Sequence, residues 1–349
     1  MSARKVVLAA ALAVLAACSE NPVSPDGTIL DASRTKGGNG IPTAPPPPMP
    51  VLIPIPVGGN PISGAAFWIN PASSAKLQAD AWRVTRPADA ADMDKIAGNS
   101  QAQWLDGRSP DILATVNSAV TAAVEAAAVP ILVAYNIPQR DCGGLSAGGT
   151  TAAEYRSWIA GFARGLAGRK AVVILEPDAL TQMDCLSAAD QATRINLIQY
   201  AIGILKEQPN VHVYLDGGNS AWKSASDQAS RLARASVTAA DGFAVNVANF
   251  QFTSSSIAYG KAISDRIGGK HFIIDTSRNG LGPTLDNQWC NPDGRALGIP
   301  STTVTGDSRV DAYLWIKIPG ESDGACNGAP VASSWWADYA LGLAQRSAL

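Results

Sequence analysis

The chain has 349 residues, 46% of them hydrophobic, and 27 Lys and Arg against 29 Asp and Glu give a formal net charge of -2. Without a run of basic residues this balance gives no electrostatic footprint for nucleic acid, so we expect an uncharged partner. The only two histidines, His212 and His271, fall in strand-like runs and are expected to be packed or surface residues. A histidine-rich zinc site or a Ser-His-Asp triad is therefore a poor hypothesis.

The first residues, MSARKVVLAAALAVLAACSE, have the layout of a bacterial export signal. Basic residues 4–5 precede an apolar run, 6–17, that is shorter than the roughly 20 residues a membrane-spanning helix needs. The box LAAC at 15–18 resembles a lipoprotein processing site. We expect residues 1–17 to be removed and Cys18 to carry a lipid at the cell surface or in the periplasm. The alternative is an ordinary cleaved signal with an incidental cysteine.

Residues 18–61 are polar, then rich in proline and glycine, and show neither a helical nor an alternating period. This composition predicts a semi-extended tether. Residues 62–349 have a length that one β/α barrel can reach, so a single catalytic domain suffices. We expect a monomer that contacts the membrane only through its N-terminal lipid.

Short apolar runs rich in β-branched residues alternate with segments of helical character, which indicates repeated βα units around a parallel sheet. Helices are expected at 112–128 and 152–168. The expected strands are 102–106, 131–135, 171–177, 211–216, 242–249, 271–277 and 311–317. An α/β fold with a parallel β/α barrel follows.

Almost every expected strand ends in a polar residue. In a β/α barrel these ends form the active-site face. Any single one of them could instead cap a helix or shape a turn, but their convergence favours a functional site. The residues are Asp106, Tyr135, Asn136, Glu176, Asp178, Asp216, Asn246, Asn249, Asp275 and Lys317.

Acid/base chemistry by carboxylates is what remains after the histidine-based sites are excluded. Three tryptophans, Trp104, Trp222 and Trp289, fall near the same loops. Indole faces that stack on sugar rings, together with acids and amides that pair with hydroxyls, suit a sugar chain as substrate. A carboxylate-bound Mg²⁺ or Ca²⁺ remains an alternative, although no acidic loop has the spacing of a calcium site.

Seven motifs resemble, in order and spacing, glycoside hydrolase family 6, the cellulase family of endoglucanases and cellobiohydrolases. They are YNIPQRDC, VVILEPDAL, LDGGNSAW, AVNVANF, DTSRNGLGP, QWCNPDGRALG and TGDSRVDAYLWIKIPGESDG. The resemblance runs from about residue 102 to the C-terminus. It implies a distorted, incomplete barrel of seven strands and hydrolysis of β-1,4-glucan with inversion at the anomeric carbon, without a metal or cofactor.

The resemblance also implies catalytic roles. The aspartate of the EPD motif, Asp178, is the general acid, and burial beside other carboxylates would raise its pKa. The aspartate of RDC, Asp141, tunes that acid and helps to hold the attacking water. Asp323 in GESDG is the candidate base, and Tyr135 presses on the sugar ring at the cleavage point.

Trp104 and Trp289 resemble sugar platforms on the non-reducing side, and Trp222 resembles one on the leaving-group side. Trp289 could instead pack beside a disulfide. Asp216 either orients groups near the leaving-group side or only braces its loop. The partners implied for sugar hydroxyls are Lys317, Glu321 and Asn246.

Two positions depart from the family pattern. Asn219 stands where the family usually has histidine, so binding beyond the cleavage point is expected to differ. In the loop after Cys142, the serine that the family often has near the catalytic water aligns with Ala147, next to Ser146.

Four cysteines besides Cys18 allow three disulfide pairings. The resemblance implies Cys142–Cys185 and Cys290–Cys326, each tying an active-site loop to its neighbour.

In the cellobiohydrolases of the family that the chain resembles, two long insertions roof the cleft. The corresponding loops here, after Cys142 and Asp323, are short, which favours an open cleft and internal cleavage. We therefore expect an inverting endo-β-1,4-glucanase. The alternatives are an exo-acting cellobiohydrolase, a preference for a related glucan, and a non-catalytic glycan-binding lipoprotein.

Overall fold

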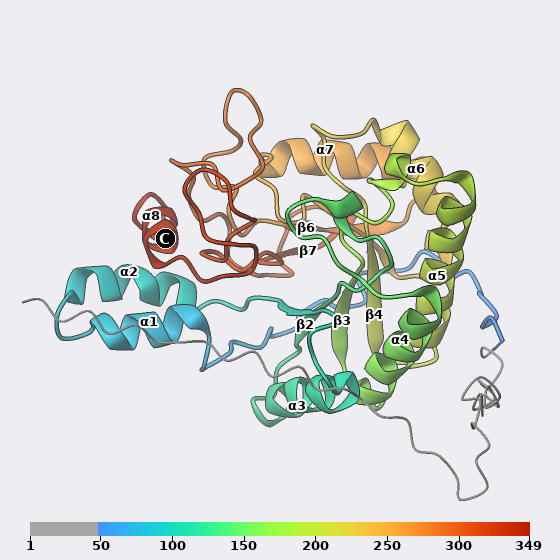
Figure 1. Cartoon of the computed structure of the whole chain (residues 1–349), viewed down its shortest axis with the longest axis horizontal. Coiled ribbons are helices and arrows are strands. Elements are labelled where there is room, and N and C mark those ends of the chain that lie inside the picture. The colour runs from blue at the N-terminus through green and yellow to red at the C-terminus, as the bar shows by residue number, and fades with distance from the viewer. Residues whose placement is uncertain (1–47) are drawn as a thin grey trace, which may run out of the picture. The chain divides into compact units, whose positions relative to one another are not determined.

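A computed structural model describes residues 48–349, which form one α/β domain around a parallel sheet (Figure 1). All seven expected strands are present, and most end a residue or more before the expected end because the polar residues that follow turn out of the sheet. The strands are β1 (Gln103–Leu105), β2 (Ile131–Ala134), β3 (Ala171–Leu175), β4 (Val211–Asp216), β5 (Gly242–Val245), β6 (His271–Asp275) and β7 (Val310–Leu314).

The sheet is curled but open, a distorted barrel in which the strands pair in sequence order from β1 to β7. Within residues 48–349 no ladder joins β1 to β7. Two contacts cross this gap instead: Ala102 N–H donates to the Trp315 carbonyl at 2.9 Å, and Trp104 Nε1 donates to the Ile316 carbonyl at 2.8 Å. The incomplete barrel expected from the sequence is confirmed.

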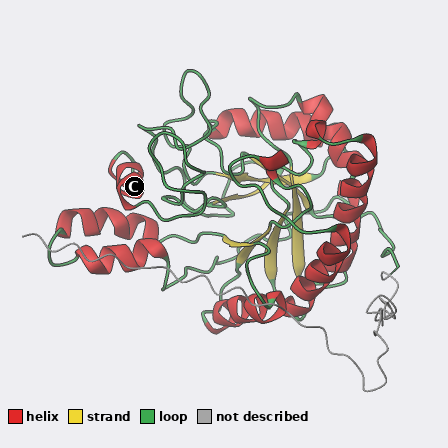
Figure 2. Ribbon diagram, viewed as in Figure 1, coloured by secondary structure: helices red, strands yellow, loops and turns green. Residues whose placement is uncertain are grey.

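Most of the helices cover the outside of the curled sheet, as Figure 2 shows in red, and three others pack on one another to one side of it. The two expected helices are present as α3 and α4, and α4 begins with a capping box in which Thr151 and Glu154 bond reciprocally. The helices are α1 (Ser74–Trp82), α2 (Pro87–Ala97), α3 (Ile112–Glu125), α4 (Ala152–Leu166), α5 (Ala188–Lys206), α6 (Ala225–Arg234), α7 (Thr253–Ser264) and α8 (Ala337–Gln345).

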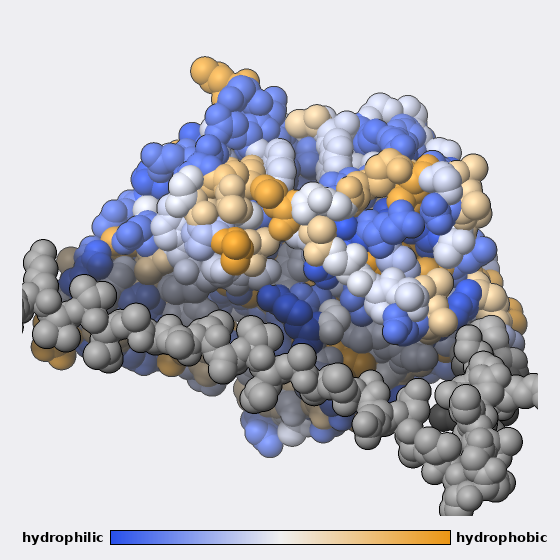
Figure 3. Space-filling model, in the orientation of Figure 1, coloured by the Kyte–Doolittle hydropathy of each residue, from blue (hydrophilic) through white to orange (hydrophobic). Residues whose placement is uncertain are grey.

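The core lies on both faces of the sheet. Strand residues such as Val173 and Leu175 face the outer helices, whereas Val172 and Ile174 point into the barrel. Burial on both faces explains why the strands read as continuous apolar runs. The surface drawn in Figure 3 mixes hydrophilic residues with small hydrophobic patches, as expected of a surface open to water.

Residues 48–61, the end of the expected tether, lie against the domain. Ile55 N–H donates to the Thr238 carbonyl at 2.8 Å, and Lys270 Nζ donates to the Ile55 carbonyl at 2.9 Å. The expected export signal, Cys18 and the rest of the tether lie outside the described residues. Of the helices in the described part of the chain, none is long and apolar enough to cross a membrane.

Candidate active site

A cavity of about 800 Å³ opens at the carboxyl ends of the strands. It gathers side chains at the ends of β1 to β5 and β7, together with residues of the segment between β6 and β7. Of the residues to which the family resemblance gives a catalytic or sugar-binding role, eleven line it: Trp104, Tyr135, Asp141, Asp178, Asp216, Asn219, Trp222, Trp289, Lys317, Glu321 and Asp323. The strand-end residues Asp106, Asn136 and Asn249 line it as well.

Asn246 is the expected sugar partner that does not line the cavity. It is fully buried, and its Nδ2 donates to the Asp275 carbonyl at 2.8 Å while its Oδ1 accepts from Gln251 N–H at 3.0 Å. The amide thus holds the ends of β5 and β6 together, and a contact with a sugar hydroxyl does not fit this arrangement.

Several residues at these strand ends have left-handed backbone, which is uncommon for residues other than glycine. The φ angles are 55° at Asp141, 49° at Glu176, 68° at Asp178 and 54° at Ala248. Such a conformation costs about 1–3 kcal/mol and persists only where neighbouring groups hold it. Asp141, Asp178 and Ala248 line the cavity, and left-handed backbone at such positions is typical of a functional site.

Asp178 is held by hydrogen bonds to two neighbouring residues. Its backbone N–H donates to Asp216 Oδ2 at 3.0 Å, and Tyr135 Oη donates to its Oδ2 at 3.4 Å. Burial, followed by the charge of Asp141, raises the pKa of Asp178 to about 7. Near neutral pH a large fraction of the molecules therefore still carries a proton on Asp178 that this carboxyl can donate.

Asp216 is buried and accepts backbone N–H groups from Asp178 and from Gly218, the latter at 3.3 Å. Burial, followed by the charge of Asp178, raises its pKa. Of the two roles left open by the sequence, bracing the loop is the one that these contacts support.

Asp141 lies on a loop that its neighbours hold closely. Its Oδ2 accepts from both the backbone N–H and Oγ of Ser146, at 2.8 and 2.9 Å. Ser146 Oγ also lies 3.0 Å from Tyr135 Oη. Ser146, one residue before Ala147, thus places a hydroxyl group against Asp141.

Tyr135 is positioned by an arginine that sequence reasoning missed. The Arg140 guanidinium lies 4.4 Å from the Tyr135 ring centre, and its Nη1 donates to the Tyr135 carbonyl at 2.6 Å. Arg140 Nε also donates to the Ser146 carbonyl at 2.9 Å. Burial raises the pKa of Tyr135, so its hydroxyl stays protonated and available as a donor.

Asp323 is an ionised carboxylate surrounded by donors. Arg278 Nη1 donates to its Oδ2 at 2.8 Å, and Lys317 Nζ lies 3.3 Å from its Oδ1. Burial alone would raise the pKa of Asp323, but the charges of Arg278 and Lys317 hold it below its usual range. The pKa values of Asp178 and Asp323 are thus shifted in opposite directions within one cavity.

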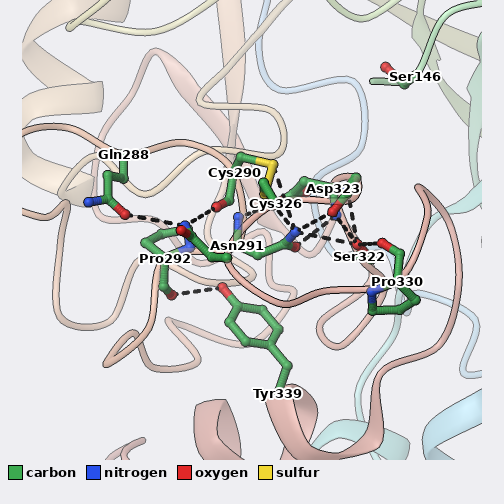
Figure 4. The surroundings of a disulfide bond; sticks show 12 residues. Ser146, Gln288, Cys290, Asn291, Pro292, Ser322, Asp323, Cys326, Pro330 and Tyr339 are labelled. Atoms are coloured by element: carbon green, nitrogen blue, oxygen red, sulfur yellow. Dashed lines mark hydrogen bonds between the residues drawn. A yellow bond between two sulfur atoms is a disulfide. The ribbon is translucent and has the colours of Figure 1, made fainter. Parts of the chain in front are cut away.

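Asn291 fixes Asp323 through a reciprocal pair of hydrogen bonds beside a disulfide, as Figure 4 shows. Asn291 N–H donates to Asp323 Oδ2 at 3.0 Å, and Asp323 N–H donates to Asn291 Oδ1 at 2.8 Å. Asn291 follows Cys290, so the bridge to Cys326 ties the two segments together. The sequence signal for both Asn291 and Arg278 was their place inside the quoted motifs.

Both implied disulfides are present. Cys142–Cys185 joins the loop after β2 to the turn after β3, and Cys290–Cys326 joins the loop before β7 to the loop after it. The two Cα–Cα distances are 6.1 and 6.3 Å. Each bridge lies within three residues of an aspartate of the site.

The tryptophans differ in exposure. Trp222 and Trp289 are 39% and 51% exposed, as a stacking platform requires, whereas Trp104 is half-buried and packs edge-on against Tyr135 with ring centres 5.1 Å apart. Lys317 Nζ lies 6.0 Å from the Trp104 ring centre.

The remaining expected residues are more enclosed than exposed. Burial raises the pKa of Glu321. Asn219 is 5% exposed, and its Oδ1 accepts from Ala221 N–H at 3.0 Å, which leaves its Nδ2 for other partners.

The two histidines lie outside the cavity. His212 pairs with Asp241, and His271 pairs with Asp311. Residues 48–349 contain no group of three or more His, Cys, Asp and Glu residues that could hold a metal.

Comparisons with known proteins agree with this geometry. Residues 62–347 match the model of glycosyl hydrolases family 6. The chain is 42% identical over 291 residues to endoglucanase A of Cellulomonas fimi, covering 82% of this chain and 62% of that protein. It is 44% identical over 271 residues to endoglucanase A of Thermobispora bispora, covering 74% and 58%.

Among solved structures, the endoglucanase Cel6 of Mycobacterium tuberculosis, in complex with methyl-cellobiosyl-4-deoxy-4-thio-beta-D-cellobioside, is 45% identical with a TM-score of 0.79. The match covers 82% of this chain and 99% of that one. The chain spans about three fifths of the length of the two curated relatives.

Proposed function

The chain belongs to glycosyl hydrolase family 6, and from that membership we propose that it is an inverting endo-β-1,4-glucanase acting on cellulose or related β-glucans. One observation carries the proposal beyond family membership. Asp178 keeps a proton near neutral pH while Asp323 is ionised, and both line one cavity with exposed indoles. Carboxyl groups whose pKa values are driven apart are the expected acid and charged partner of a glycosidase.

Asp178 is the general acid. As the bond between the anomeric carbon and the glycosidic oxygen breaks, its proton passes to that oxygen, which leaves as a free hydroxyl. Tyr135, which donates to Asp178 Oδ2, stabilises the carboxylate that forms. The hydrogen bond from Asp178 N–H to Asp216 keeps the left-handed turn, and with it the carboxyl, in place.

Water attacks the anomeric carbon from the opposite side of the sugar ring. Asp141, to which Ser146 donates, and Ser146 itself hold this water, and the proton that the water loses passes to the carboxylate of Asp323. The two cations beside Asp323 make it a weak proton acceptor. Besides accepting the proton, Asp323 contributes a negative charge that stabilises the positive charge developing on the sugar.

Endo action is the first candidate because the loops that flank the cavity are short and the two curated relatives quoted above are named endoglucanases. Exo action is the second candidate, because loops that meet over a cleft favour cleavage from a chain end. Leu145 of the loop after Cys142 lies against Gly324 of the loop after Asp323. A non-catalytic glycan-binding role is the third, and the intact carboxylate set disfavours it.

We also propose that the protein is exported, with residues 1–17 as signal and a lipid on Cys18. The tether would span residues 18–61 and carry residues 62–349 as a monomeric catalytic domain. The two disulfides support an oxidising compartment. Mass spectrometry of the mature N-terminus would test the lipid.

Activity on carboxymethylcellulose, mixed-linkage glucan and cello-oligosaccharides tests the function. An endo enzyme lowers the viscosity of carboxymethylcellulose long before reducing ends accumulate, whereas an exo enzyme releases cellobiose with little change in viscosity. Inversion requires the α-anomer as first product in proton NMR. Binding without hydrolysis on all three substrates would leave the non-catalytic role.

A further inference from the structure

Gln182 connects the turn that carries Asp178 to the loop that carries Asp141. Its backbone N–H donates to the Asp178 carbonyl at 2.8 Å, one helical turn earlier. Its Nε2 donates to Asp141 Oδ1 at 3.0 Å. The side chain thus crosses between the segments that Cys142–Cys185 also joins.

This contact completes the support of Asp141. Ser146 donates twice to Oδ2, and Gln182 donates to Oδ1, so donors on both oxygens fix the rotation of the carboxylate. The support is needed because Asp141 and Cys142 both have left-handed backbone, at φ 55° and 49°. Without Gln182, the Oδ1 side would have no protein donor among residues 48–349.

The amide oxygen of Gln182 has no hydrogen-bond partner among the described residues. This oxygen, Oε1, is buried, although the residue lines the cavity. Buried polar atoms are nearly always paired, and those left without a protein partner beside a polar cavity usually bind water. The amide can therefore donate to Asp141 and accept from a water molecule beside it.

We propose that Gln182 is a positioning residue for the water side of the reaction, holding Asp141 through Nε2 and accepting a hydrogen bond from cavity water through Oε1. The inference rests on the proposed function. Since Gln182 also follows Asp178 by one turn, it could instead matter only for the general acid. The two possibilities predict a different dependence of a Gln182 variant's activity loss on the leaving group of the substrate.

The test compares Gln182→Leu with the wild type on two substrates, a cello-oligosaccharide and dinitrophenyl β-cellobioside. The dinitrophenolate leaves without a proton, so this substrate needs the attacking water but not the general acid. A residue on the water side should matter for both. We expect kcat to fall roughly tenfold to a hundredfold on each substrate, with KM changed less than about threefold.

Gln182→Glu provides a second variant of the same size, in which a carboxylate replaces the donor facing Asp141. It should lose at least as much activity on both substrates. The matched control is Gln228→Leu, because Gln228 is a buried glutamine that does not line the cavity, and its side chain makes one hydrogen bond, accepted by Oε1 from Thr181 Oγ1 at 3.5 Å. Its kcat should stay within about twofold of the wild type, whatever its thermal stability.

A fivefold or larger loss on both substrates, in a Gln182 variant that unfolds cooperatively, supports the inference. A smaller loss, or one confined to the cello-oligosaccharide, overturns it. If the wild type hydrolyses neither substrate, the proposed function fails and the inference falls with it. An active wild type with unaffected Gln182 variants refutes the inference alone.

Discussion

The backbone N–H of Asp178 donates a 3.0 Å hydrogen bond to Oδ2 of Asp216, so one buried carboxyl at the end of β4 fixes the turn that carries another. Asp178 has left-handed backbone, and Asp216 also accepts from Gly218 N–H. The position of the proposed proton donor therefore depends on an acceptor on the neighbouring strand.

Replacing Asp216 tests this dependence. Asp216→Ala removes the acceptor and leaves buried N–H groups without a partner, at a cost of about 1–3 kcal/mol. We expect kcat to fall about tenfold or more because the carboxyl of Asp178 shifts. Asp216→Asn keeps an acceptor oxygen and should stay within a few fold of the wild type. Equal losses in both variants would contradict a role based on the hydrogen bond.

The stability of the domain should fall as pH rises, because of Glu176. This buried carboxyl accepts from the backbone N–H groups of Asn136 and Ile137, and burial raises its pKa to about 7. Its folded pKa exceeds the value of 4.5 for a free side chain, so the folded state binds more protons between about pH 4.5 and 7. Its contribution is complete below this window and is lost as pH rises through it.

Thermal unfolding of the wild type and of Glu176→Gln between pH 4.5 and 8 measures this contribution. Each pH unit of the window corresponds to about 1.4 kcal/mol for a fully shifted group. The variant should lose part of the pH dependence, even if it is less stable throughout. Parallel curves for the two proteins would show that Glu176 does not titrate in this range.

Arg278 should be needed to keep Asp323 ionised. Its side chain is fully buried between Asp323 and the Ala248 carbonyl. Arg278→Met leaves a buried carboxylate with one neighbouring cation, so the pKa of Asp323 should rise and stability should fall by about 3–5 kcal/mol. Because the lowered pKa stabilises the folded state above the unfolded value, the loss should be larger at pH 6 than at pH 3.

The pH profile of activity reads out the same change. In Arg278→Met the acidic limb of kcat should move to higher pH, since Asp323 must be ionised to act. Arg309→Met, which removes an arginine paired with Asp265 on the surface, is the control and should leave the limb in place. An unmoved limb in Arg278→Met would argue against a catalytic charge on Asp323.

Each disulfide should support both stability and activity. In the chain-entropy model, closing loops of 43 and 36 residues contributes about 3–4 kcal/mol per bridge. Cys142 directly follows Asp141, so the double variant Cys142→Ser, Cys185→Ser should lower both the melting temperature and kcat. The melting temperature and kcat of the variant, measured with the second bridge intact, check this. A stable variant with full activity would contradict a role for the bridge in holding Asp141.

The strands and the active-site face could be predicted from the sequence because apolar runs and the polar residues that end them are local patterns. Other features depend on contacts that periodicity does not encode. The sequence does not show whether the Asn246 amide bonds a sugar hydroxyl or the Asp275 carbonyl, and in the structure it bonds the carbonyl. Likewise, the loop geometry decides which residue faces Asp141, and it is Ser146 rather than Ala147 that bonds the carboxylate.

The same limit applies to the ends of the domain. Residues 48–61 have no period, yet Pro50 fits against Gly203, where a side chain would collide with it. Likewise, α2 packs on α8, which brings distant parts of the chain together. Such contacts follow from shape and single hydrogen bonds rather than from pattern.

The most direct test of the account is the activity of Asp178→Ala on two substrates that differ in their leaving group. Hydrolysis of cellotetraose needs the proton of Asp178, and we expect kcat to fall roughly 10²–10⁴-fold. On dinitrophenyl β-cellobioside, which needs no proton, the variant should stay within about tenfold of the wild type. Near-normal activity on cellotetraose, or equal losses on both substrates, would contradict the assignment of Asp178 as the general acid.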